Sequence, residues 1–106
     1  MKMEKQIDLF IEMVKSEEFI EAHEVLEVSW KELKKVDQME ANIQKGLING
    51  ATAIALKKKG RDRGAYQVWD TYKKYQPLIK ETKSPYKKKY EESENILDKM
   101  YQKYML

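Results

Sequence analysis

His23, the only histidine of the chain, lies in a segment that also holds three glutamates and a tryptophan, EAHEVLEVSW at residues 21–30. On a helix of 100° per residue, His23 falls within an apolar face and Glu27 lies one turn further along the same side. A carboxylate removed from water needs a partner, and an imidazole four residues away supplies one. The spacing therefore predicts that His23 and Glu27 are largely buried and in direct contact or joined by one water, with Glu24 at the edge of the face and Glu21 more exposed.

A second group of polar and small residues follows in QKGLINGATAIA, residues 44–55. Gln44 lies at the margin of an apolar helix face and is expected to be a semi-buried amide that faces the core. Glycine in a helix costs about 1 kcal/mol relative to alanine, so Gly46 and Gly50 indicate the close passage of another helix or of a ligand, and close packing is favoured. Together the two segments predict a polar pocket formed by Glu21, His23, Glu24, Glu27, Trp30, Gln44 and Asn49.

The segment HEVLE is similar to the zinc motif His-Glu-x-x-His, in which two histidines one turn apart bind the metal and the glutamate acts as a base. Here the second histidine is missing, and Glu27 would have to replace it in a chain without cysteine. Glu24 and Glu27 could hold Mg²⁺ or Mn²⁺, but the next helix would add only the amides of Gln44 and Asn49. We therefore expect no metal site and no cofactor.

A hydrolase without metal would need a nucleophile beside His23. The hydroxyl candidates are Ser29 and Thr52, and neither lies in a recognised motif; no phosphate-binding loop or nucleophile elbow occurs. Whether the chain is an enzyme stays open, and the sequence favours a role without catalysis. The alternative is a hydrolase or a metal-dependent enzyme that uses His23 with Glu24 or Glu27.

The charge is unevenly distributed along the chain. The net charge is +3, but residues 1–53 carry 7 Lys against 11 acids and residues 54–106 carry 14 Lys and Arg against 7 acids. The basic segment KKKGRDR, residues 57–63, could attract nucleic acid. Lysines interleaved with acids are more typical of a solvated face, and no helix-turn-helix or other named signature is present. Nucleic-acid binding through residues 57–63 is a second alternative that the sequence does not favour.

The elements that must position these residues all have helical periodicity. Ile7, Phe10, Ile11 and Val14 follow the i, i+3, i+4, i+7 pattern of one helical stripe. Four more helices are predicted at about residues 17–35, 38–59, 62–79 and 85 to near the C-terminus, with caps at Ser16, Asp37, Asp62 and Ser84 and a stop at Gly60. No segment alternates as a strand does. The chain is predicted to be one all-α domain, residues 1–106, a compact bundle of about five antiparallel helices with short connections.

No stretch approaches the roughly 20 consecutive apolar residues of a membrane span. The N-terminus MKMEKQIDLF has acids where a signal peptide has its apolar region. The absence of cysteine excludes disulfides. We expect a cytoplasmic protein that does not associate with membranes.

The order of EAHEVLEVSW, QKGLINGATAIA and the later RGA at residues 63–65 resembles the bacterial domain-of-unknown-function 309 family, a group of small all-helical proteins. The resemblance covers about residues 17–75. It implies that the polar motif of the family falls on Glu21, His23, Glu24, Glu27 and Trp30, followed by Gln44, Gly46, Arg63, Gly64 and Ala65. This chain departs from the pattern at Asn49, where the family often has a second Gln. The resemblance implies a fold and assigns no activity.

We therefore expect a small helical protein that acts as a binding or interaction module, with its polar pocket between the second and third helices. The ligand would be a small molecule or a protein partner. A homo-oligomer is compatible with the sequence.

Overall fold

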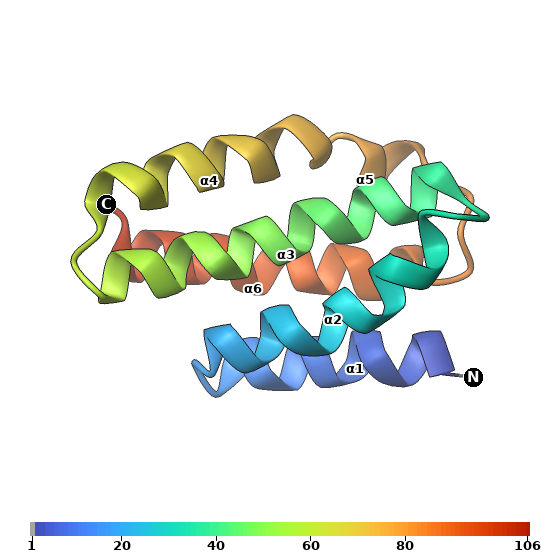
Figure 1. The fold of residues 1–106 in the computed structure, drawn as a ribbon, viewed down its shortest axis with the longest axis horizontal. Coiled ribbons are helices and arrows are strands. Elements are labelled where there is room, and N and C mark those ends of the chain that lie inside the picture. The colour runs from blue at the N-terminus through green and yellow to red at the C-terminus, as the bar shows by residue number, and fades with distance from the viewer. Residues whose placement is uncertain (1) are drawn as a thin grey trace.

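The computed structural model describes the backbone of residues 2–106 and the side chains of residues 3–106. Figure 1 shows a bundle made of α1 (Lys2–Lys15), α2 (Phe19–Leu33), α3 (Gln38–Lys58), α4 (Asp62–Tyr75), α5 (Leu78–Glu81) and α6 (Lys87–Tyr104). Five of these helices are long, and α5 is a single turn of four residues. No strand occurs in the described part of the chain. The prediction of an all-α bundle is confirmed.

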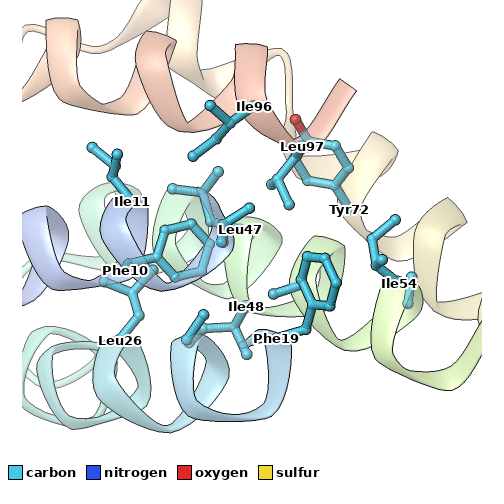
Figure 2. Close-up of a cluster of buried hydrophobic side chains, with 14 of the residues drawn as sticks. Phe10, Ile11, Phe19, Leu26, Leu47, Ile48, Ile54, Tyr72, Ile96 and Leu97 are labelled. Atoms are coloured by element: carbon cyan, nitrogen blue, oxygen red, sulfur yellow. The ribbon is translucent and has the colours of Figure 1, made fainter. Parts of the chain in front are cut away.

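The central element is α3, which packs against α2, α4, α5 and α6 (Figure 1). Further packed pairs are α1 with α2, α1 with α6, and α5 with α6. Side chains from five helices meet around α3 in one core, and Figure 2 shows Phe10, Leu26, Leu47, Tyr72 and Leu97 among them. Because α3 is covered on several sides, its residues decide how its neighbours are placed.

Glycines form the side of α3 that α4 and α6 approach. A Cβ atom added to Gly46 would lie 2.9 Å from the Cβ of Tyr75, and one added to Gly50 would lie 2.8 Å from Cδ1 of Leu97. Both distances are too short for real carbon atoms. The two glycines therefore lie where other helices pass close to α3. A larger side chain at Gly46 would push α4 away, whereas at Gly50 the end of the Leu97 side chain would have to move.

The turn between α1 and α2 differs from the predicted one. Ser16 does not cap α2, which begins at Phe19 after Glu18 as the N-cap residue. Glu17 has φ of 62°, in the left-handed region that residues other than glycine seldom adopt. The start of α2 therefore lies two residues later than predicted.

Contacts from the C-terminal end of α6 hold Glu17 in this conformation. Its carboxylate accepts a hydrogen bond of 2.5 Å from Nζ of Lys103 and another from the hydroxyl of Tyr104. Nζ of Lys58 lies 3.6 Å away. These partners, Lys103 first, lower the pKa of Glu17 from 4.5 to about 2. A capping pattern read along the chain cannot include partners that are more than 80 residues away.

The predicted boundaries of α3 are close to the observed ones. The side chain of Asp37 accepts a hydrogen bond of 3.1 Å from the backbone N–H of Glu40, as the capping pattern predicts. The helix ends at Lys58 with Lys59 as its C-cap residue, and Gly60 follows with a φ of 80°, which suits a residue without Cβ. Asp62 is not the cap of α4 but its first residue, and it pairs with Nζ of Lys57 at 3.1 Å.

The last part of the chain contains one more break between helices than predicted. α4 ends at Tyr75, and Ile79 belongs to the separate turn α5. Pro77 lies between them and has no N–H to continue α4, but it fits just before a new helical turn. Ser84 accepts a hydrogen bond of 3.1 Å from the backbone N–H of Tyr86, yet α6 itself starts only at Lys87.

No helix among residues 2–106 combines the length and the apolar character needed to cross a membrane.

Gly46→Ala should lower the free energy of unfolding by about 1–3 kcal/mol, although alanine favours the helix by about 1 kcal/mol. The new methyl group would meet the Cβ of Tyr75, which cannot turn away unless α4 moves. Gly64→Ala is the matched control, because the nearest atom would be Cδ1 of Leu56 at an ordinary 3.8 Å. Urea denaturation measures both variants. A Gly46→Ala protein as stable as Gly64→Ala would contradict the close contact between α3 and α4.

Candidate functional site

His23 joins α2 to α3 through both ring nitrogens. Nδ1 lies 2.8 Å from Oγ1 of Thr52 on α3, and Nε2 lies 3.4 Å from Oε2 of Glu27 on α2. The hydroxyl of Thr52 also donates to the carbonyl oxygen of Ile48 at 2.9 Å. A hydroxyl has one proton, so while Thr52 makes this bond the proton between Thr52 and His23 must be on Nδ1. Nε2 is left to face Glu27.

His23 and Glu27 are in contact, but they are not largely buried as predicted. Their side chains are 33% and 36% exposed. The buried side of α2 is centred on Ala22, Leu26 and Leu33, so His23 and Glu27 lie at its margin. This position corrects the burial prediction and leaves one side of the pair open to solvent.

A hollow of about 230 Å³ lies beside this pair, between α2 and α3. Side chains from both helices line it: His23, Glu27, Trp30, Lys45, Ile48, Asn49 and Thr52. Nδ2 of Asn49 donates to the carbonyl oxygen of Lys45 at 2.7 Å. The structure thus brings four of the predicted pocket residues to one place: His23, Glu27, Trp30 and Asn49. We call this place the α2–α3 hollow.

Three residues of the predicted pocket lie elsewhere. Glu24 is exposed, and Glu21 is exposed beside a different hollow that Lys58 also lines. Gln44 is fully buried and its Nε2 donates to the hydroxyl of Tyr90 on α6, at 3.0 Å. Gln44 does face the core, as expected, but it does not reach the α2–α3 hollow.

Sequence reasoning missed three residues of the hollow. The predicted pocket does not contain Lys45 or Ile48, and the sequence indicates Thr52 only as a candidate nucleophile. Their spacing carries a signal, because residues 45, 48, 49 and 52 follow the i, i+3, i+4, i+7 pattern of one helix side. Once Asn49 is placed in a pocket, the other three follow from this pattern.

A comparison with known families bears on both helices of the hollow. The model of a domain of unknown function, DUF309, matches residues 7–68. The chain belongs to the DUF309 family. The matched range includes all of α2 and α3, and therefore every residue that lines the α2–α3 hollow. No curated protein and no solved structure matches this DUF309 chain.

A second polar cluster of the DUF309 chain lies at the other side of α3. Glu40 is 8% exposed, and its Oε2 accepts hydrogen bonds from the hydroxyl of Tyr90 at 2.5 Å and from Oγ of Ser84 at 2.8 Å. Gln44 donates to the same Tyr90 hydroxyl. Burial and then the bond to Glu40 raise the pKa of Tyr90 above its usual value. This cluster ties α3 to α6 and to the loop before α6.

Acidic residues do not gather into a metal site in the part of the chain that the structure describes. No three His, Asp or Glu side chains of these residues lie close enough together to hold a metal ion. Glu24, which would have to join Glu27 in a carboxylate site, is exposed.

The basic segment at residues 57–63 is partly engaged within the protein. Lys57 pairs with Asp62 at 3.1 Å, and Lys58 pairs with Glu17 at 3.6 Å. The other cations of the segment are exposed: Lys59, Arg61 and Arg63.

Tyr90→Phe should lower the free energy of unfolding by about 1–3 kcal/mol, because it strands buried polar groups of Gln44 and Glu40. Tyr101→Phe is the control. Its ring stacks on Trp69 with centroids 4.7 Å apart, and its hydroxyl makes no hydrogen bond to the described residues, so this loss should have little effect. Equal urea midpoints for the two variants would show that the Tyr90 hydroxyl does not stabilise the fold.

Proposed function

We propose that this DUF309 protein is a binding module that holds a small molecule in the α2–α3 hollow. The observation that carries the proposal is the state of His23, which is anchored on one side by Thr52 and is one-third exposed on the other. A polar pair that served only to fill the core would be enclosed by its neighbours. A ligand can reach His23 and Glu27 without any helix having to move.

The mixture of side chains in the hollow supports the proposal. Binding sites for small molecules are concave and mostly apolar, with a few polar groups in fixed places. Trp30 and Ile48 supply apolar surface, and His23, Glu27 and Asn49 supply polar groups. Hydrogen bonds within the protein hold His23 and Asn49 before any ligand arrives. Such pre-ordering lowers the entropy that is lost when a ligand binds.

A small molecule suits the hollow better than a protein partner does. A specific protein interface involves roughly 20–30 residues on each partner, whereas only seven residues line the hollow. For nucleic acid, the pairing of Lys57 and Lys58 with carboxylates of the same chain leaves fewer cations of residues 57–63 for phosphates.

One observation favours a hydrolase as a second candidate. Thr52, His23 and Glu27 form a chain of hydroxyl, imidazole and carboxylate, which is the order of groups in an activated nucleophile. Two features weigh against it. The Thr52 hydroxyl donates to the Ile48 carbonyl, and backbone N–H groups inside α3 are engaged in the helix, so they cannot stabilise an oxyanion.

The test is an NMR titration of the ¹⁵N-labelled protein with a library of small fragments. The chain has two tryptophans, and their indole N–H signals serve as probe and internal control. Trp30 lines the hollow, whereas Trp69 is 7% exposed and stacks on Tyr101. Fragments that bind should shift the Trp30 signal and leave the Trp69 signal in place.

His23→Ala should weaken the binding of such fragments by about tenfold, the loss of roughly 1.4 kcal/mol expected for a hydrogen bond to a fixed group. Glu21→Gln is the control, since Glu21 lies outside the hollow. If no fragment shifts Trp30, or if His23→Ala binds them as the wild type does, the proposal fails. Hydrolysis of an activated ester that both His23→Ala and Thr52→Val abolish would favour the hydrolase instead.

A further inference from the structure

Positive charge exceeds negative charge around the α2–α3 hollow. Three lysines surround it. Lys31 lies 3.8 Å from Oε1 of Glu27, Lys34 lies 4.7 Å from the centre of the Trp30 ring, and Lys45 lines the hollow itself. Glu27 is the single carboxylate among the lining residues. The lining itself holds one lysine and one carboxylate, and the excess of cations comes from Lys31 and Lys34 at its edge.

Glu27 already has a cationic partner within the protein, because Lys31 lies beside its carboxylate. One carboxylate oxygen faces His23 at 3.4 Å and the other faces Lys31 at 3.8 Å. Lys34 and Lys45, by contrast, have no carboxylate within 4.0 Å among the side chains of residues 3–106. Nζ of Lys45 instead lies 5.5 Å from the centre of the Tyr75 ring. The charges that remain available to a ligand are cationic.

The free hydrogen-bond donors of the hollow also favour an anionic ligand. Asn49 uses one N–H of its amide for the carbonyl oxygen of Lys45 and keeps a second N–H for another acceptor. Lys45 offers the donors of its ammonium group. Both residues lie on the same side of α3, one helical turn apart, and rotation of the flexible Lys45 side chain away from Tyr75 would bring its ammonium group to an anion held by Asn49.

The walls and size of the hollow define the rest of the ligand. Trp30 presents a flat indole, and Ile48 supplies a second apolar surface. The volume of about 230 Å³ is below the roughly 300 Å³ at which pockets for drug-sized ligands begin. A single ring with a short substituent fits such a space.

We infer that the α2–α3 hollow binds a small anion that carries one flat apolar ring, such as a monocyclic aromatic carboxylate. The ring packs against Trp30 and Ile48, and the anionic group lies toward Lys45 and Asn49. This inference rests on the proposed function, because it names the class of ligand for the same site.

The experiment compares three probes that share a phenyl ring and differ in charge: phenylacetate, phenylacetamide and 2-phenylethylamine. Each is titrated into the ¹⁵N-labelled protein, and the shift of the Trp30 indole N–H gives its dissociation constant. Phenylacetate should bind about tenfold or more tightly than the neutral amide, since hydrogen bonds to charged groups are the stronger ones. The amine should bind most weakly.

Two lysine variants test whether Lys45 is the source of the preference for an anionic ligand. Lys45→Gln should bring the affinity for phenylacetate close to that for phenylacetamide. Lys74→Gln is the matched control: Lys74 also lies 5.5 Å from the Tyr75 ring, but it does not line the hollow. It should leave the preference unchanged.

The outcomes separate this inference from the proposed function. Equal binding of all three probes, or tighter binding of the amine, overturns the anion inference while the site remains a binding site. A preference that survives Lys45→Gln overturns it as well. If none of the probes shifts Trp30, the inference fails, and the fragment titration decides the proposed function independently.

Discussion

The close approach of α3 and α4 at Gly46 is the constraint on which the arrangement of the helices depends. It fixes which side of α3 faces α4 and α6, because only glycine leaves room for Tyr75 there. A helix is rigid, so the side that bears Ile48 and Thr52 is then turned toward α2. One packing requirement thereby determines where the polar side chains of α3 are presented.

The α2–α3 hollow exists because some side chains of α2 near α3 are buried in the core and others reach the surface. Leu26 is fully buried, whereas His23 and Glu27 lie at the margin of the buried face. Thr52 supplies an acceptor at the inner end of His23. The outer end stays accessible, and this combination of an anchored and an open side distinguishes the hollow from the enclosed cluster of Glu40 and Tyr90.

Sequence patterns predicted most features that depend on neighbours along the chain, although they missed the break at Pro77 and misplaced the cap of α4. They did not predict the features that depend on distant residues. The helical stripes, the Asp37 cap and the stop at Gly60 are local, and they were predicted correctly. The conformation of Glu17 depends on the far end of α6. Likewise Gln44 turns toward Tyr90, 46 residues away. The contact of His23 with a partner 29 residues later needs the register of α2 on α3, which no local pattern contains.

The hydrogen bond between His23 and Thr52 anchors the α2–α3 hollow, and a double-mutant cycle can measure it. His23→Ala, Thr52→Val and the double variant are unfolded in urea, and their free energies of unfolding are compared with that of the wild type. We predict a coupling energy of about 0.5–1.5 kcal/mol, the net value of a hydrogen bond in a protein. Free energies that add to within about 0.3 kcal/mol would contradict it, because His23 would then not be anchored to α3.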